Sequence, residues 1–124
     1  RNCIFETNEF ELILICWEGG QTTPIHDHGG EECWVYVVDG SFKETIFAKN
    51  LDGDFIPSKC TSVGVGDIAY MKDFMGFHEL KNERNTRSMS LHLYAKPIRS
   101  CNVLELDTGN LAMCELVYDT NIEL

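Results

Sequence analysis

The hydrophobic positions of the chain gather in short runs that are separated by glycine, proline, asparagine and aspartate. These runs occupy residues 11–17, 33–40, 42–49, 62–71, 88–98 and 103–119. Most are rich in β-branched and aromatic residues, and Pro97 ends the fifth. Runs of this length and composition, bounded by turn residues, predict β-strands, with two short pieces in 62–71 and a closing hairpin in 103–119.

The turn residues between the runs predict how the strands follow one another. Asp39-Gly40 ends the run at 33–40, and the next run, at 42–49, follows almost at once, which predicts a hairpin. Residues 50–54 predict a further turn. No segment keeps a period of 3.6 residues over three turns, so no long amphipathic helix is expected. Eight or more short, evenly spaced strands predict an all-β protein, either a closed barrel or a double-sheet jelly roll.

Composition narrows the classes of function. The chain has 124 residues, 44% hydrophobic and 24% charged, which suits one globular domain over residues 1–124. Its formal net charge of −10 argues against a nucleic-acid partner, and no apolar run approaches the ~20 residues of a membrane span. Because the chain starts at Arg1 without an initiator methionine, we expect a piece of a longer protein.

The cysteines do not form a recognisable metal or redox motif. They are scattered singly along the chain, at Cys3, Cys16, Cys33, Cys60, Cys101 and Cys114. A chain with this apolar content does not need disulfides for stability, so we expect reduced, mostly buried thiols and a cytoplasmic location.

Two histidines one residue apart are the first indication of chemistry. In a strand, His26 and His28 would project to the same side. The spacing around them is that of the first motif of the cupin barrels, formed here by Gly20, His26, His28, position 33 and Gly40. Cys33 occupies the place of that motif's glutamate. Glu32 also lies within the permitted spacing after His28, but Cys33 fits the distance to Gly40 better.

A second cupin motif is looser. His78 and Asn82 have its spacing, but the approach from Gly66 is one residue longer and lacks the usual proline. Three neutral imidazoles would form a facial site for a divalent cation, and zinc as well as iron accepts such ligands. Cys33 could itself be a ligand, or simply a small buried apolar group.

Four separated segments then resemble one family. IHDHGGEECW (25–34), DGSFKETIF (39–47), GFHELKN (76–82) and SLHLYAKP (90–97) are similar to cysteine dioxygenase, an iron-dependent cupin that oxidises L-cysteine with O2 to cysteine sulfinate. The resemblance extends from Arg1 to about Thr120, and the family's N-terminal helical segment is absent from this chain. It implies a cupin-type jelly-roll barrel, Fe(II) and a role in cysteine catabolism. Expected partners are L-cysteine and O2, without nucleic acid or membrane, and we expect a monomer.

The resemblance also implies roles for particular residues. The family's iron ligands fall on His26, His28 and His78. The cysteine and tyrosine that the family joins by a thioether bond fall on Cys33 and Tyr94. The sequence permits this cross-link without showing that it forms.

Substrate-binding and catalytic roles fall on three further positions. The family's arginine that pairs with the substrate carboxylate corresponds to Arg1, and its histidine beside the iron corresponds to His92. His92 and Tyr94 share a strand face with Ser90, so His92 can hold Tyr94 or the substrate by a hydrogen bond, and the Tyr94 hydroxyl can steady bound oxygen. Taken singly, His92 would be a core histidine, Tyr94 an ordinary barrel tyrosine and Arg1 a frayed chain end.

Two other functions compete with an L-cysteine dioxygenase. Related enzymes act on 3-mercaptopropionate, but they typically carry glutamine in place of the arginine and lack the cysteine, so Arg1 and Cys33 argue against that substrate. A non-enzymatic or zinc-binding cupin that binds a small anion is the alternative from a different class.

Overall fold

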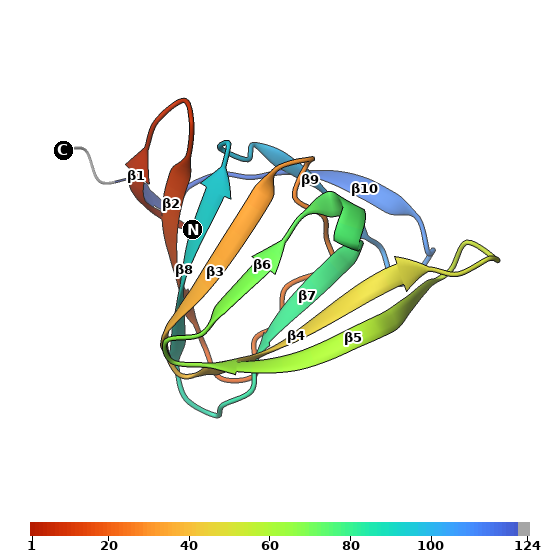
Figure 1. The fold of residues 1–124 in the computed structure, drawn as a ribbon, viewed down its shortest axis with the longest axis horizontal. Helices are drawn as coiled ribbons and strands as arrows, with labels where there is room; N and C mark the ends of the chain where they lie inside the picture. The colour runs from red at the N-terminus through yellow and green to blue at the C-terminus, as the bar shows by residue number, and fades with distance from the viewer. Residues whose placement is uncertain (122–124) are drawn as a thin grey trace.

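The computed structural model describes residues 1–121, whose regular secondary structure is almost entirely β-strand (Figure 1). Residues 122–124 of the predicted domain lie outside this range. The elements are β1 (Asn2–Glu6), β2 (Glu11–Trp17), β3 (Glu32–Asp39), β4 (Ser41–Lys49), β5 (Phe55–Gly64), β6 (Ile68–Met71), the 3-10 turn η1 (Asp73–Met75), β7 (Phe77–Asn82), β8 (Ser88–Ala95), β9 (Ser100–Leu104), β10 (Leu111–Glu115) and β11 (Thr120–Asn121). Among the described residues, no helix has the length and apolarity needed to cross a membrane.

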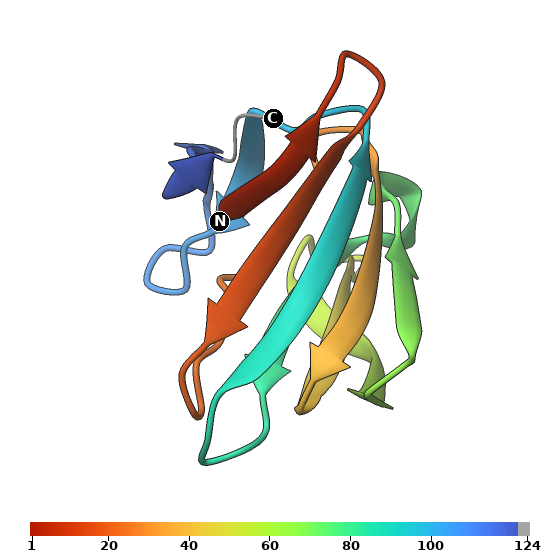
Figure 2. The same cartoon turned by 90° about the vertical axis from the view of Figure 1, so that its left-hand side faces the viewer.

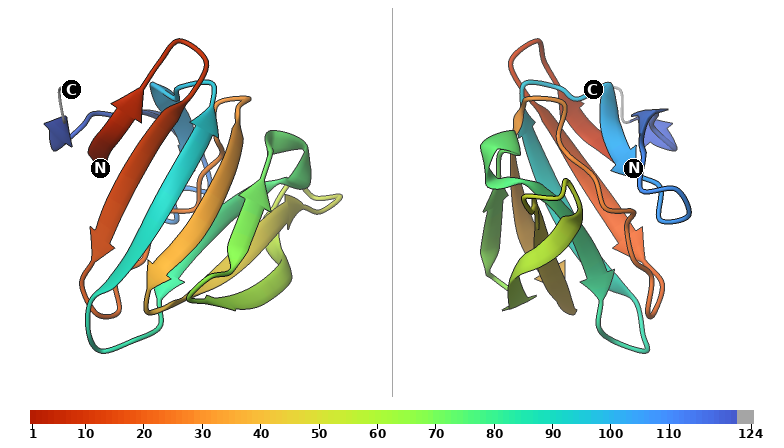
Figure 3. Two further views of the ribbon diagram at one scale, coloured as in Figure 1. Left: turned by 60° about the vertical axis from the view of Figure 1, so that its left-hand side comes forward. Right: turned by 90° about the vertical axis from the view of Figure 1, so that its right-hand side faces the viewer.

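Two layers of strands face each other. The larger layer is a six-stranded sheet in the order β11-β1-β2-β8-β3-β6, which Figure 2 shows from outside. The other layer contains the sheet β5-β4-β7 and the ribbon β10-β9, and the right-hand view of Figure 3 shows the molecule from the side of this layer. Strand β1 pairs with β11 in parallel. This arrangement confirms the predicted all-β, double-sheet architecture.

A segment outside the named strands joins the parts of the second layer. Thr22 forms a bridge with Lys81 of β7, and His26 forms bridges with His78 of β7 and Val103 of β9. The segment before β3 therefore fills the space between β7 and the β9-β10 ribbon. It carries the first histidine motif along the inner wall of the barrel.

Strand β8 shows how the layers divide polar from apolar positions. Its burial alternates strictly, with Ser88, Ser90, His92 and Tyr94 buried and their neighbours less so. A strand with one face on the core is expected to alternate in this way. The buried face is polar, however, so the interior near β8 is built for more than hydrophobic packing. The apolar core lies beside it and includes Ile13, Trp17, Val35, Val37, Phe42, Val63 and Leu80.

The hairpin predicted at Asp39-Gly40 is wrong. Strand β3 pairs with β8 and β6, whereas β4 pairs with β5 and β7, so the two strands lie in different sheets. Gly40 has φ of 85°, and a side chain there would collide with Ser88. Because both edges of β3 are already occupied, the tight turn becomes a corner from one layer to the other.

Most other predicted strands are confirmed, and the exceptions have a local cause. Strand β2 coincides with the run at 11–17, and the predicted closing hairpin is the β9-β10 pair. The sequence prediction missed residues 55–61 of β5, a stretch that contains Pro57 and is largely exposed. As the edge strand of its sheet, β5 tolerates proline and shows no alternation of burial.

Asn82, the last residue of the second motif, holds a loop together. It is fully buried, and its amide donates to the carbonyls of Glu18 (3.0 Å) and Thr86 (2.9 Å). Its carbonyl oxygen accepts from the Ser88 hydroxyl (2.8 Å) and the Arg84 amide (3.1 Å). The motif's asparagine thus fixes the β7–β8 connection against the end of β2.

Candidate metal centre

His26 and His78 come from neighbouring segments of the second layer, and their backbones pair with each other. The His26 amide donates to the His78 carbonyl over 2.9 Å, and the His78 amide donates to the His26 carbonyl over 3.0 Å. Residues paired in this way carry their side chains on the same face of a sheet. The sheet itself therefore sets the separation of these two rings.

His28 lies where the segment leaves the sheet and turns. Its amide donates to Asp73 Oδ1 over 2.9 Å, and the Gly30 amide donates to Asp73 Oδ2 over 2.5 Å. Asp73 begins η1, so this short turn anchors the loop that carries His28. His26 and His28 do not share a regular strand, because β3 begins only at Glu32. Their rings converge through the anchored loop instead.

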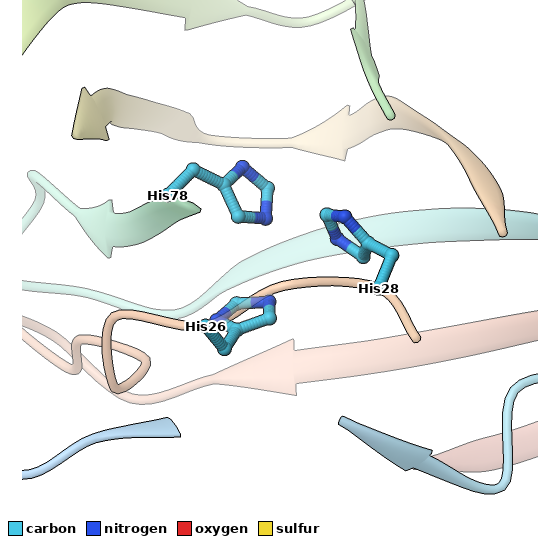
Figure 4. Close-up of side chains that lie close together, drawn as sticks. All are labelled: His26, His28 and His78. Atoms are coloured by element: carbon cyan, nitrogen blue, oxygen red, sulfur yellow. The ribbon is translucent and has the colours of Figure 1, made fainter. Parts of the chain in front are cut away.

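The three histidine side chains form one cluster. A potential ligand atom from each lies within 4.8 Å of those from the other two. The ring centroids are 4.6 to 5.2 Å apart, and Figure 4 shows the rings of His26, His28 and His78 gathered around a common space. Imidazole nitrogens at this spacing suit one shared divalent cation.

Neither residue considered for the carboxylate position of the motif belongs to this cluster. Glu32 accepts a hydrogen bond from the Tyr70 hydroxyl over 2.9 Å and pairs with Lys72. Cys33 is directly opposite Tyr94 in the β3–β8 register. Within residues 1–121, the candidate ligand set is therefore three neutral histidines with no acidic side chain.

Hydrogen bonds on the far side of the rings select which nitrogens remain for a ligand. His26 Nδ1 contacts the Pro24 carbonyl at 2.7 Å, and His78 Nδ1 contacts Glu44 Oε2 at 3.0 Å. Both rings thus present Nε2 to the cluster, as metal-binding histidines commonly do when a carbonyl or carboxylate holds the other nitrogen. His78 Nε2 and His28 Nδ1 are buried without a hydrogen-bond partner among residues 1–121. Buried nitrogens left in this state fit a cation as their partner.

Burial keeps the histidines neutral. It lowers the pKa of His28 to about 2, with His78, His26 and His92 adding to the effect, and it lowers the pKa of His78 well below its ordinary value. The pKa of His26 is lowered by burial as well. A neutral imidazole keeps the lone pair that a metal ion needs. The cluster is therefore ready to bind a cation near neutral pH.

A chain of hydrogen bonds holds His92 in the wall beside the cluster. Trp17 Nε1 donates to Ser90 Oγ over 2.8 Å, and Ser90 Oγ contacts His92 Nε2 at 2.7 Å. Ser90 accepts from Trp17, and its own proton is free to be donated to His92 Nε2, which would leave the ring proton of His92 on Nδ1. Burial lowers the pKa of His92 to about 3, so the ring is neutral.

Tyr94 and Cys33 face each other across β8 and β3. Burial raises the pKa of the Cys33 thiol to about 12. Burial and the neighbouring Cys33 raise the pKa of the Tyr94 hydroxyl well above its ordinary value. Directly opposed strand residues have Cβ atoms about 4.5–5.5 Å apart, so the sulfur and the phenol ring are close.

Arg1 is held firmly rather than frayed. Its carbonyl accepts from the Asp119 amide over 2.8 Å beside the β1–β11 pair, and its side chain is only 14% exposed. The guanidinium carbon lies 5.7 Å from the Tyr94 ring centroid and 5.4 Å from that of Tyr118. Nη2 donates to Glu11 over 3.0 Å, whereas Nη1 is buried and has no hydrogen-bond partner among residues 1–121.

One cavity of about 220 Å³ connects these groups. The polar side chains that line it are Arg1, Thr23, His26, Asp27, His28, His78, His92 and Tyr94, and the remaining wall is mainly apolar. The structure thus brings together the three candidate ligands, the two residues of β8 and the arginine. The volume of the cavity is below the range of drug-sized pockets, which suits a substrate of a few heavy atoms.

Sequence reasoning missed residues that position the site, notably Glu44, Asp73 and Glu11. Glu44 had a signal, because it lies two residues after the buried Phe42 in a strand, where the next inward side chain is expected. Glu11 and Asp73 had none, since each begins an element and its partners come from distant parts of the chain.

Comparisons of the sequence with known proteins agree with this geometry. The family model for cysteine dioxygenase type I matches residues 1–106. The chain is 33% identical over 115 residues to cysteine dioxygenase type 1 of Danio rerio, covering 89% of this chain and 57% of that protein. It is 31% identical over 114 residues to the Homo sapiens protein of that name, with the same two coverages. The chain therefore spans somewhat more than half the length of these curated relatives.

Solved structures support the fold. A Klebsiella pneumoniae protein with a double-stranded β-helix domain aligns with a TM-score of 0.63 and 18% identity, covering 91% of this chain and 75% of that chain. An RmlC-like cupin protein from Desulfovibrio desulfuricans aligns with a TM-score of 0.55 and 19% identity, covering 78% and 81%. The fold is therefore the expected cupin barrel. Through the family model that spans most of its length, the chain belongs to the cysteine dioxygenase type I family.

Proposed function

We propose that this protein is an iron-dependent thiol dioxygenase that oxidises L-cysteine with O2 to cysteine sulfinate. One observation carries the proposal: a three-histidine cluster and Arg1, whose Nη1 is buried without a hydrogen-bond partner among residues 1–121, line the same small cavity. A ligand that satisfies both ends needs a group that binds a metal ion and a group that accepts hydrogen bonds from a guanidinium. L-Cysteine has both, in its thiolate and its carboxylate.

The ligand set favours an anionic sulfur. Three neutral histidines leave the full positive charge of a divalent cation uncompensated, which lowers the pKa of a thiol that binds to it. A carboxylate in the ligand set would cancel part of that charge. The absence of an acidic residue from this cluster among residues 1–121 therefore supports a thiol substrate.

His26, His28 and His78 would hold ferrous iron, which supplies O2 activation and the redox chemistry when bound. In the overall reaction both oxygen atoms of O2 are added to sulfur, which loses four electrons, so no separate reductant is consumed. The protein's part is to bind the thiol, to orient it and to exclude bulk water.

Three residues of the wall orient the reacting groups. Arg1 Nη1 donates to the substrate carboxylate, a charge-assisted contact that fixes the far end of the molecule. The raised pKa of Tyr94 keeps its hydroxyl protonated, so it is a donor toward the reacting oxygen. In this proposal Ser90 donates to His92 Nε2, so that the ring carries its proton on Nδ1 and offers it as a second donor beside the cluster.

Cys33 and Tyr94 form the cross-link of the family in this proposal. Their direct opposition in the β3–β8 register and the burial of both side chains support it. The S–C bond replaces one hydrogen on the sulfur and one on the phenol ring, and O2 would take up the two electrons and two protons released, giving hydrogen peroxide. Intact-mass and peptide mass spectrometry after turnover should show the loss of two hydrogen atoms, and Cys33→Ser should abolish that loss.

The function is tested by loading the purified protein with Fe(II) without air and then adding L-cysteine and O2. We expect O2 uptake with one cysteine sulfinate formed per O2. In parallel reactions, 3-mercaptopropionate should be a poorer substrate, because it has no amine to reach the metal ion. Tight binding of Zn(II) with no uptake after Fe(II) loading would instead favour the non-enzymatic cupin, and faster turnover of 3-mercaptopropionate would favour the other thiol dioxygenase.

A further inference from the structure

Glu11 is a fully buried carboxylate at the arginine end of the cavity, and both of its oxygens are occupied. Oε1 accepts from Arg1 Nη2 over 3.0 Å and from the Ile98 amide over 2.9 Å. Oε2 accepts from Arg99 Nη1 over 3.3 Å and from the Tyr118 hydroxyl. A carboxylate has about four lone-pair sites, so four donors from four directions leave it little freedom to move.

This arrangement fixes the orientation of Arg1. Glu11 holds Nη2, and the rings of Tyr94 and Tyr118 lie within 5.7 Å and 5.4 Å of the guanidinium carbon. A planar guanidinium restrained at one nitrogen and flanked by two rings has little rotational freedom. Nη1 is thereby left buried and unpartnered among residues 1–121, in a side chain that lines the cavity.

Tyr118 connects the two arginines to this carboxylate. Its hydroxyl donates to Glu11 Oε2 and accepts from Arg99 Nη1 over 3.0 Å, while its ring lies beside Arg1. Burial and the hydrogen bond to Glu11 raise its pKa above the ordinary value, so it stays a donor. Arg99 is largely exposed and pairs on its other side with Glu6. The contacts toward the cavity therefore run through Glu11 and Tyr118, and Arg99 closes the cluster from outside.

We propose that Glu11 and Tyr118 are positioning residues that direct Arg1 Nη1 into the cavity and thereby select thiols that carry a carboxylate. This inference rests on the proposed function. A guanidinium that is already oriented loses less conformational entropy when the carboxylate arrives, so the gain appears as tighter binding of that one class of substrate. A thiol without a carboxylate gains nothing from it.

The test compares Glu11→Gln with wild type in two measurements on the Fe(II)-loaded protein. The first is KM and kcat for L-cysteine, and the second is the inhibition constant of cysteamine, which keeps the thiol and amine but lacks the carboxylate. Since a hydrogen bond to a charged group is lost or weakened, KM should rise about 10- to 100-fold. The value of kcat should stay within about threefold, and the cysteamine constant should not change.

Two further variants make the result specific. Tyr118→Phe removes one hydroxyl and keeps the ring beside Arg1, so KM should rise by less than in Glu11→Gln, with cysteamine again unaffected. Glu6→Gln is the matched control, because Glu6 pairs with Arg99 but is not a partner of Arg1, and its KM should equal that of wild type. If Glu11→Gln does not fold, Tyr118→Phe against Glu6→Gln decides the question alone.

An unchanged KM in Glu11→Gln, or equal weakening of L-cysteine and cysteamine, would overturn the inference, since the first denies any role and the second indicates a general structural one. Failure of the proposed function looks different, because wild type itself would then form no cysteine sulfinate.

Discussion

The two ends of the cavity are prepared for their ligands in opposite ways. At the metal end, His26, His28 and His78 are neutral, and the protein supplies lone pairs without charge. At the other end, Arg1 brings a full charge that a buried carboxylate, Glu11, already offsets. The cation would therefore be held by three neutral, desolvated nitrogens that the fold places close together. The substrate carboxylate would be held by a charged guanidinium whose orientation is fixed before the substrate binds.

The largest test of the metal end is His78→Ala. Because it removes one of three candidate ligands and leaves Glu44 without its partner, metal affinity should fall by more than the roughly 10- to 100-fold typical of losing a supporting residue. Turnover should be lost with it. Elemental analysis after dialysis measures the retained iron, with the exposed neighbour Lys81→Ala as control. Full iron content and activity in His78→Ala would exclude it as a ligand.

The next largest effect is expected from acidification, which should destabilise the protein through the buried neutral histidines at and beside the metal end. The folded-state pKa values of His28 (about 2) and His92 (about 3) lie below the ordinary 6.5, so the folded protein binds fewer protons than the unfolded chain. The free energy of unfolding therefore keeps its full value above pH ~6.5 and decreases as the pH falls. The decrease is about 1.4 kcal/mol per pH unit for each histidine, or about 4 kcal/mol for both at pH 5. Urea unfolding of metal-free protein measures it. In His92→Gln the pH slope should be shallower, and a parallel slope would contradict the assignment.

A smaller effect is expected from the residue behind the metal end. Glu44→Ala removes the acceptor that orients His78, so metal affinity should fall about 10- to 100-fold while some turnover at saturating iron remains. Glu44→Gln keeps an acceptor and should lose less. Iron titration with a competing chelator distinguishes them. Equal affinities in wild type and Glu44→Ala would show that the sheet alone orients the ring.

The smallest effect should come from the rim of the arginine end. Glu6 pairs there with Arg99, whose side chain is 58% exposed. Solvent screens such pairs, so Glu6→Gln should change the free energy of unfolding by less than about 1 kcal/mol. Thermal unfolding of the two proteins measures this. A much larger loss would mean that the charged end is a single cooperative network rather than a buried pair with an exposed rim.

Much of the barrel was predictable, because hydrophobic runs and turn residues report strands directly. The corner at Gly40 was not, since a tight turn shows that the chain reverses without showing which strands pair, and both edges of β3 were occupied by distant segments. Strand β7 was visible only as the motif around His78, because two of the three residues on its buried face, His78 and Asn82, are polar and hide the alternation of burial.

The candidate site divides in the same way. The histidines could be singled out because motif spacing preserves their order, and the structure brings them together. The residues behind them could not, because the roles of Glu11 and Glu44 depend on which distant donors reach their carboxylates. Asn82 shows the reverse case, since the motif marks it while its contacts tie down the β7–β8 connection.

The reciprocal backbone pair between His26 and His78 has a consequence for metal exchange. Because amide hydrogen bonds form this pair, two of the three candidate ligand side chains should be in place before a metal ion binds. Metal loading should then need no refolding of the chain. Any divalent ion of suitable size would enter the same three-histidine site, and copper and zinc would bind there with higher intrinsic affinity than ferrous iron. Under the proposed function, occupancy by iron would depend on which ions the surroundings offer, so the history of a preparation would decide whether it oxidises cysteine.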